Sequence, residues 1–365
     1  MQQYFIGVGS IKLLPEELRT RGVKSIFLVR DADAYEISGA ADAIRQNFNA
    51  FEMAEFADFA KNPQYEDVEK GLRLFLEKAY DCILTIGGGS VIDMAKLISY
   101  YAAEKNASKQ YPPIYAVPTT AGTGSEATHF AVMYINGIKH SIADEHILPE
   151  IAVVDPQFTY SSPPYLAACA GIDALAQAIE SYWNVYANDE SLGYAEKALA
   201  LLYPNLYKAV ALNDKEAKNR VAEGAYWAGR AINSTKTTAP HAISYPFTIH
   251  YGYPHGHAVA LTLPYFMAYN YAKDASVLRK SVDNLLHKQR MERLYALLGI
   301  ASVEEACAVM KKYIARLGLD MKLPANFEAE IVLSEINEER LANNPAILSK
   351  KELKKYFDSG LDCAG

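Results

Sequence analysis

The sequence is short of positive charge and has no long apolar run. Its 365 residues carry a net charge of −7 at pH 7, whereas nucleic-acid-binding proteins usually present a basic face. No apolar run approaches the roughly 18 residues that span a bilayer, so we expect no membrane contact. The first residues also lack a basic segment followed by an apolar one, which predicts no signal peptide. A cytoplasmic protein that binds neither nucleic acid nor membrane is expected.

Cysteine is scarce as well. The four cysteines, Cys82, Cys169, Cys307 and Cys363, are scattered and form no C-x-x-C pair. They predict neither a zinc cage nor a disulfide framework, and they suit a reducing cytosol.

Short apolar runs alternate with helical patterns over the first 160 residues. Four of these runs predict buried strands: Ser25–Arg30, Cys82–Ile86, Ile114–Val117 and Ile151–Val154. Strands that alternate with helices indicate a mostly parallel sheet covered on both faces. The segment His129–Asn136 is expected to form an added hairpin or edge strand.

Helical periodicity dominates from Tyr165 to the end of the chain, after the segment Ser161-Ser162-Pro163-Pro164. We therefore predict a boundary near residue 162. It separates an α/β domain, residues 1–162, from an all-helical domain, residues 163–365.

The apolar run Ala239–Pro264 holds four of the eight histidines: His241, His250, His255 and His257. A single histidine in such a run is usually a core residue with satisfied hydrogen bonds. Four within one short run are better explained by a metal or proton-transfer site.

A glycine-rich turn, Gly87-Gly88-Gly89-Ser90, joins the second predicted strand to a helix. Glycines let the backbone approach an anion, and the helix N-terminus offers free N–H groups, so this turn predicts a phosphate site. The spacing is not G-x-G-x-x-G, and a tight turn without a ligand is the alternative. A second polar loop, residues 118–126, follows the next strand, and loops at the carboxyl ends of neighbouring parallel strands meet in one crevice.

Five ordered motifs resemble the iron-containing (group III) alcohol dehydrogenases. They are GGGSVIDMAK, PTTAGTGSEAT, ILPEIAVVDP, GIDALAQAIE and the PHG near residue 255. The resemblance covers about residues 1 to 270. It implies an α/β fold with an N-terminal Rossmann-like dinucleotide domain and an all-α C-terminal domain, the dehydroquinate synthase-like fold, with a metal in the cleft between them.

The resemblance implies a nicotinamide dinucleotide, NAD(H) or NADP(H). A carboxylate at Asp31 would receive the adenosine ribose and repel a 2′-phosphate, which favours NAD, although the adjacent Arg30 weakens that preference. The implied cofactor-binding residues are Asp31, Gly87, Gly88, Gly89, Ser90, Asp93, Thr119, Thr120, Thr123 and Lys139.

The family binds its metal through one aspartate and three histidines. Here Asp173, His241 and His255 match three of these ligands, while Gln177 replaces the remaining histidine. Asp173 and Gln177 lie four residues apart, so on a helix they point the same way and can share one ion. Glutamine is a neutral, weaker donor, and loss of the metal is the alternative. The ligand set suits Fe(II), Zn(II) or Mn(II).

A proton donor for the product oxygen is less well defined. Many family members carry a histidine four residues past the first histidine ligand, and this chain carries Tyr245. A tyrosine is a poor relay at neutral pH because its pKa is high. His257 or His250 is expected to take that role, with a structural histidine as the alternative for each.

The segment before His241 carries a cation among polar groups. Its candidate substrate residues are Asn233, Ser234, Lys236 and Thr237. A lysine surrounded by hydroxyl and amide donors suits a phosphate, phosphonate or carboxylate. The alternative is a solvated helix start.

Together with the motifs, this segment resembles the phosphonoacetaldehyde reductase branch of the family, from phosphonate biosynthesis. The resemblance implies reduction of phosphonoacetaldehyde to 2-hydroxyethylphosphonate by a homodimer. The alternatives are another family reductase acting on a small aldehyde, diol or sugar acid, a dehydroquinate-synthase-like lyase, and a non-catalytic nucleotide binder.

Overall fold

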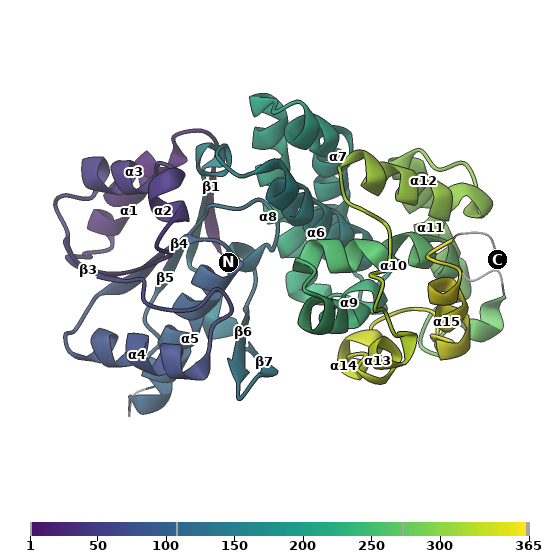
Figure 1. The fold of residues 1–365 in the computed structure, drawn as a ribbon. Helices are drawn as coiled ribbons and strands as arrows, with labels where there is room; N and C mark the ends of the chain where they lie inside the picture. Colours follow the sequence, from purple (N-terminus) through teal and green to yellow (C-terminus); the bar gives the residue numbers. More distant parts are fainter. Residues whose placement is uncertain (1, 107–108, 272–273, 363–365) are drawn as a thin grey trace. The chain divides into compact units, whose positions relative to one another are not determined.

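The computed structural model describes residues 2–106, 109–271 and 274–362. The chain divides into two compact units, residues 1–162 and residues 163–365. The first unit is α/β and the second is helical, which confirms the predicted fold class (Figure 1).

The first unit is built on a six-stranded sheet in the order β1-β8-β5-β4-β2-β3, and every neighbouring pair is parallel. Its strands are β1 (Gln3–Ile6), β2 (Ser25–Arg30), β3 (Glu52–Phe56), β4 (Cys82–Gly87), β5 (Ile114–Pro118) and β8 (Ile151–Val154). The chain runs outward from β2 to β3 and in the other direction from β4 to β5. The carboxyl ends of β2 and β4 therefore flank the point where the strand order reverses.

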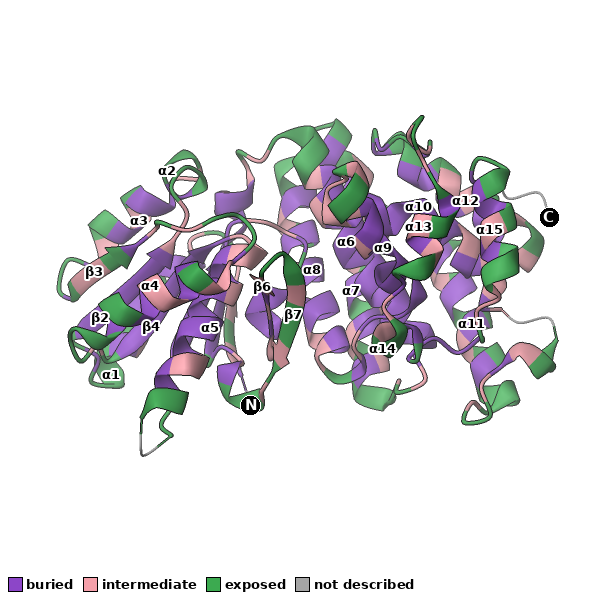
Figure 2. Cartoon of the chain, turned by 60° about the horizontal axis from the view of Figure 1, so that its bottom comes forward, coloured by how far each residue is buried: buried purple, intermediate pink, exposed green. Residues whose placement is uncertain are grey.

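Alternation along the strands explains why helices cover both faces. On β2, Ile26 and Leu28 pack into one hydrophobic cluster, whereas Phe27 and Val29 pack into the other. Because successive side chains of a strand point to opposite faces, a strand of continuous apolar residues must be covered on both faces of the sheet. Figure 2 shows the central strands as buried. The covering helices are α1 (Leu14–Thr20), α2 (Ala34–Ile37), α3 (Ala40–Asn47), α4 (Tyr65–Leu76) and α5 (Gly89–Lys105).

The expected hairpin is present as a separate two-stranded sheet. Strand β6 (Phe130–Ile135) pairs antiparallel with β7 (Ile138–Ala143). The turn between them is Asn136-Gly137, whose φ angles are 52° and 77°. Asparagine followed by glycine tolerates this left-handed conformation, which is typical of tight hairpins.

The second unit packs its helices around α6. Nearly every residue of α6 from Ala168 to Trp183 is buried, so this helix forms the centre of the unit. The helices are α6 (Pro164–Trp183), α7 (Asp189–Ala211), α8 (Lys215–Thr235), α9 (Ala239–Tyr251), α10 (His255–Tyr269), α11 (Asn284–Leu298), α12 (Val303–Arg316), α13 (Ala329–Ser334), α14 (Glu338–Leu341) and α15 (Lys350–Asp358). Within the described ranges, none of the helices combines the length and apolar character needed to cross a membrane.

The cysteines differ in state. Cys82 and Cys169 are buried free thiols, and Cys307 is disulfide-bonded. Cys363 lies outside the described residues. The bond at Cys307 was not expected from the scattered cysteine spacing.

Candidate metal centre and nucleotide loop

Three potential metal ligands converge from three helices of the second unit. Asp173 lies on α6, His241 on α9, and His255 is the first residue of α10. Nε2 of His241 lies 3.0 Å from Oδ1 of Asp173, and Nε2 of His255 lies 3.9 Å from the same oxygen. One ligand atom from each residue falls within 4.8 Å of the others. Ligand bonds of about 2.0–2.2 Å would let a single ion contact all three.

Gly256 makes this convergence possible. A Cβ atom on Gly256 would lie 1.9 Å from the carbonyl oxygen of Cys169 and 3.0 Å from Cβ of Asp173. Only glycine therefore lets the start of α10 press against α6 and bring His255 beside Asp173. The glycine between His255 and His257 is thus explained by close packing.

Glu180 contacts the His241 ring on the side away from Asp173. The sequence reasoning did not identify this contact. Its Oε1 accepts from Nδ1 of His241, and its Oε2 accepts from the backbone N and the hydroxyl of Thr238 at 2.6 Å and 2.8 Å. Glu180 is completely buried. A carboxylate on the second nitrogen of a histidine fixes the ring so that Nε2 faces a metal. The available signal was spacing, because Glu180 lies seven residues after Asp173 on the same face of α6.

The carboxylates set the protonation of the site. Burial opposes the charged form of His241, but Glu180 and Asp173 outweigh it and raise the pKa of His241 to about 9. Burial also opposes the charged form of Asp173, yet the hydrogen bond from His241 and the nearby imidazoles lower its pKa. The arrangement is therefore anionic enough to favour a cation at its centre.

Gln177 lies one helical turn after Asp173 and is 3% exposed. It hydrogen-bonds to the Asp173 carboxylate. None of the described residues donates a hydrogen bond to its buried oxygen Oε1. A buried carbonyl-type oxygen beside Asp173 fits a neutral metal ligand, so the residues present are compatible with a bound divalent ion.

Tyr245 lies one turn along α9 from His241 and faces the same site. Its ring is parallel to that of His255, with an interplanar angle of 7° and centroids 5.9 Å apart. The ring of Tyr245 therefore lies beside that of one candidate ligand.

His257 and His250 are held elsewhere in the unit. Nε2 of His257 donates to the carbonyl of Asp320 at 2.7 Å, and Nδ1 lies 3.0 Å from the hydroxyl of Tyr165. His250 forms a 2.8 Å hydrogen bond with Glu335 and lies nine residues, about 13 Å, beyond His241 on α9. One neutral tautomer satisfies both nitrogens of His257, so the proton-transfer role expected for these two histidines gains no support from their positions.

The polar segment before α9 has an unusual backbone. Lys236 has φ 62° and ψ −173°, a region that side-chain-bearing residues rarely adopt. Its Nζ lies 3.2 Å from Oε1 of Glu339. Thr237 is buried, and its hydroxyl accepts from Arg340 at 2.7 Å. The other two predicted substrate residues lie on the last turn of α8, where Asn233 is half-buried and Ser234 is exposed.

The glycine turn of the first unit joins β4 to α5. Gly87 ends β4, and α5 starts at Gly89 without a side-chain cap, so its first N–H groups remain available to a ligand. A Cβ atom on Gly89 would lie 2.7 Å from Oγ1 of Thr123, and one on Gly88 would lie 3.5 Å from Thr120. The two polar loops thus touch at the carboxyl edge of the sheet, with Ser90 half-buried beside them. The residues fit a bound pyrophosphate.

Asp93 stabilises the second loop through hydrogen bonds. It is half-buried, with Oδ1 accepting from Ser125 at 2.5 Å and Oδ2 accepting from the backbone of Val132 at 3.1 Å. Burial raises the pKa of Asp93, against the charges of Lys96 and Lys139, the latter on β7. The structure therefore places Asp93 in the support of the loop. Its expected position beside the nicotinamide gains no support.

Lys96, which the sequence reasoning did not single out, shares this support. Its buried ammonium donates to the carbonyls of Ser125 and Phe130 at 2.6 Å and 2.8 Å. Burial lowers the pKa of Lys96 to about 8. Thr119 adds a backbone bond of 3.0 Å from its N–H to the carbonyl of Gly87, which ties the two loops together.

Asp31 follows β2 at the strand-order reversal. Its Oδ1 accepts from the backbone of Tyr35 at 3.0 Å. The neighbouring Arg30 forms a 2.7 Å ion pair with Glu55, and its guanidinium lies 4.8 Å from the ring centre of Tyr35. The guanidinium beside Asp31 is therefore paired with a carboxylate in this structure.

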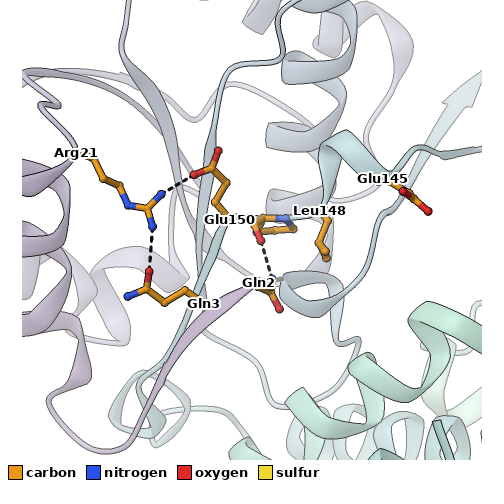
Figure 3. Close-up of a pocket in the computed structure, with 7 residues that line it drawn as sticks. Gln2, Gln3, Arg21, Glu145, Leu148 and Glu150 are labelled. Carbon is orange, nitrogen blue, oxygen red and sulfur yellow. Dashed lines mark hydrogen bonds and ion pairs between the residues drawn. The ribbon is translucent and has the colours of Figure 1, made fainter. Parts of the chain in front are cut away.

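The opposite edge of the sheet carries a pocket of about 310 Å³ (Figure 3). Gln3 begins β1 and Glu150 immediately precedes β8, so the pocket lies at the amino ends of these strands. Its arginine, Arg21, is bound to Glu150 at 2.7 Å and to Gln3 at 2.9 Å. Ligands of open α/β sheets bind at the carboxyl edge, so this pocket is not the candidate nucleotide site.

Comparison with known proteins identifies two matching family models. The model for iron-containing alcohol dehydrogenases matches residues 2–156. The model for the C-terminal part of the Fe-containing alcohol dehydrogenase family matches residues 167–356. Together they cover most of the chain.

Individual relatives agree with these models. Long-chain-alcohol dehydrogenase 1 of Geobacillus thermodenitrificans is 28% identical over 97% of this chain and 94% of its own length. The 1,3-propanediol dehydrogenase of Klebsiella pneumoniae is 32% identical over 88% of this chain and 84% of its own length. A crystal structure of sulfoacetaldehyde reductase from Bifidobacterium kashiwanohense in complex with NAD+ matches with a TM-score of 0.86 at 26% identity, over 99% of this chain and 97% of that chain.

Proposed function

The chain belongs to the iron-containing alcohol dehydrogenase family, and from this we propose that it reduces a small anionic aldehyde to its alcohol with NADH. Membership makes it an oxidoreductase acting on small aldehydes or alcohols. The substrate that we propose is phosphonoacetaldehyde, with 2-hydroxyethylphosphonate as the product. A cytoplasmic homodimer is part of the same proposal.

The metal-binding residues that we propose are Asp173, His241 and His255, with Oε1 of Gln177 as the neutral fourth donor. A bound divalent ion, Fe(II) or Zn(II), would supply Lewis acidity to a carbonyl oxygen. Glu180 accepts from Nδ1 of His241 and so would orient the ring with Nε2 toward the ligand cluster, where a bound ion would take the place of the Nε2 proton. The hydroxyl of Tyr245 or solvent would provide the proton for the product oxygen, since His257 and His250 are engaged elsewhere.

NAD is the dinucleotide that we propose. The Asp31 carboxylate stands at the strand-order reversal, where the adenosine ribose is bound in such sheets. A 2′-phosphate would need a free cation there, and the guanidinium of Arg30 is already paired with Glu55. Gly88, Gly89 and the uncapped start of α5 would hold the pyrophosphate.

One observation carries the choice of an anionic substrate. The segment Lys236–Thr238, which immediately precedes the helix of His241, combines an ammonium group with hydroxyl groups instead of the small apolar residues that suit a plain alcohol. The matching sulfoacetaldehyde reductase is named for an aldehyde that carries a sulfonate, an anion of similar shape to a phosphonate.

The test is NADH consumption by the purified full chain, with Fe(II), Zn(II) or Mn(II) added in turn. Phosphonoacetaldehyde, sulfoacetaldehyde and uncharged propionaldehyde are compared at matched concentrations. We expect kcat/KM for the anionic aldehydes to exceed that for propionaldehyde by at least about tenfold, the worth of one charge-assisted hydrogen bond. Equal values for charged and uncharged aldehydes would reject the anionic substrate. NADPH in place of NADH tests the dinucleotide preference.

A further inference from the structure

Arg340 lies close to the ligand cluster although it is 85 residues from the nearest ligand in the sequence, His255. It belongs to the short helix α14, which packs beside α9 (Figure 1). Nη1 of Arg340 donates to the hydroxyl of Thr237 at 2.7 Å. Its guanidinium carbon lies 6.0 Å from the ring centre of Tyr245, whose ring stacks on His255 at 5.9 Å. The ring of Tyr245 therefore lies between the guanidinium and a ligand imidazole.

The position of Arg340 is fixed by backbone contacts. The N–H of Asn337 donates to the carbonyl of Ala242 on α9 at 3.2 Å, and Nδ2 of Asn343 donates to the carbonyl of Thr237 at 2.9 Å. Oδ1 of Asn337 caps α14 by accepting from the N–H of Arg340 at 2.9 Å. A side chain carried on a segment tied down at both ends is oriented before any ligand arrives.

No carboxylate of the described residues pairs with Arg340. Over residues 2–106, 109–271 and 274–362, Arg340 forms no ion pair, whereas the neighbouring Lys236 is paired with Glu339 and Glu338 lies 3.5 Å from Lys350. A guanidinium has five N–H donors in a planar fork, and the bond to Thr237 accounts for one of them. The remaining donors can bind two oxygens of one anion, which a lysine cannot do.

We propose that Arg340 and the hydroxyl of Thr237 form the subsite that holds the anionic end of the aldehyde. The ligand class is a short aldehyde with a terminal tetrahedral oxyanion, a phosphonate or sulfonate. Thr237 accepts from Arg340 and keeps its own O–H to donate to the same anion. The proposal rests on the proposed function and deepens it, because it moves the main anion contact from Lys236, whose side chain is 42% exposed, to Arg340.

The alternative role for Arg340 is purely structural, as a tie between α14 and Thr237. Arg279 offers a matched control, because it bonds the same segment at the carbonyls of Asn344 and Leu341, at 2.7 Å and 3.0 Å. If Arg340 acts only as a tie, Arg340→Met and Arg279→Met will both lower activity without regard to substrate charge.

Kinetics with phosphonoacetaldehyde and propionaldehyde separate these roles. We expect Arg340→Met to lower kcat/KM for the anionic aldehyde by about 10- to 100-fold, mainly through KM, as expected for loss of a bidentate charged contact. The loss for propionaldehyde should be at least about tenfold smaller. Arg340→Lys should restore part of the anionic activity, and Arg279→Met should leave the ratio between the two substrates at the wild-type value. Equal losses on both aldehydes in Arg340→Met would overturn the proposal.

Inorganic phosphate keeps the two proposals distinguishable. In the wild type we expect phosphate to compete with propionaldehyde, and in Arg340→Met that inhibition should weaken by about tenfold or more. If phosphate competes in this Arg340-dependent way but phosphonoacetaldehyde is not reduced, the subsite stands and the named substrate fails. If phosphonoacetaldehyde is preferred equally by wild type and Arg340→Met, the function stands and the Arg340 subsite fails. If phosphate does not compete and uncharged aldehydes are preferred, both fail.

Discussion

Glu180 is hydrogen-bonded to the imidazole of His241 on the side opposite to Asp173, so one histidine ring bridges two carboxylates of the same helix. The two carboxylates lie two turns apart on α6, and both they and the ring are buried. One carboxylate is a candidate ligand, and the other orients the ring. This difference in role can be tested.

Replacing Glu180 should weaken metal binding without removing a ligand. Glu180→Ala leaves Nδ1 of His241 without its acceptor, and we expect the metal dissociation constant to rise about 10- to 100-fold. Glu180→Gln keeps an acceptor but loses the charge, so its effect should be smaller. Competition with a chromogenic chelator measures both, and Glu223→Ala, at a half-buried carboxylate on α8, is the control. Unchanged affinity in Glu180→Ala would contradict the orienting role.

Gln177 is the position where an added nitrogen should strengthen the site. In Gln177→His an imidazole replaces a neutral amide oxygen one turn from Asp173, and we expect affinity for Zn(II) to rise by about tenfold or more. Gln177→Leu, which removes the donor at similar volume, should lower affinity. The same chelator competition is the measurement. If Gln177→Leu binds as tightly as the wild type, Gln177 is not a ligand.

Gly89 should be essential for the dinucleotide but not for the fold of the second unit. A Cβ atom there would lie 2.7 Å from Oγ1 of Thr123 and force the two loops apart. We expect Gly89→Ala to raise the dissociation constant for NADH by about tenfold or more, measured by fluorescence titration. Gly193→Ala on α7 is the matched control, since its Cβ would meet no atom within 4 Å. Wild-type NADH affinity in Gly89→Ala would count against the cradle.

Glu126 should make stability depend on pH. Burial raises the pKa of Glu126 to about 7, whereas an unfolded glutamate titrates near 4.5. When the pKa of a carboxyl group is higher in the folded protein than in the unfolded chain, its contribution to stability is present below the pKa of the unfolded chain. That contribution is lost as the pH rises through the pKa of the folded protein. Glu126→Gln stays neutral at every pH. We therefore expect its free energy of unfolding, relative to that of the wild type, to rise by about 3 kcal/mol between pH 4.5 and pH 8.

Denaturant unfolding of both proteins across this pH range provides the measurement. The relevant quantity is the difference in unfolding free energy between wild type and Glu126→Gln, since other titrating groups cancel in it. A difference that stays constant or shrinks as pH rises would show that Lys96 or solvent already compensates the buried charge.

The sequence predicted the interior of the sheet better than its edges. The runs Ser25–Arg30 and Ile151–Val154 are continuous apolar strands, and the structure gives them the same bounds. Strands β1 and β3 were missed because they lie at the edges of the sheet and are partly exposed, at Tyr4 on β1 and at Glu52 and Glu55 on β3. A half-exposed strand of four or five residues has too short a pattern to stand out.

The candidate site was predictable where its residues share a motif. Spacing on one helix and the family motifs pointed to Asp173 and Gln177, and the family motifs singled out His241 and His255 within the histidine run. Arg340 carries no such signal, because it is brought near Thr237 only by the packing of α14 on α9. Nor could the spacing separate His255 from His257, two residues apart. Their different surroundings follow from the close approach at Gly256.

The contacts of Glu180 and Asp173 with one histidine ring restrict how α9 can move along α6. Sliding α9 along α6 by a single turn, about 5.4 Å, would break the contacts of His241 with both carboxylates and those of Thr238 with Glu180. The register of the two helices is thus locked whether or not the rest of the unit relaxes.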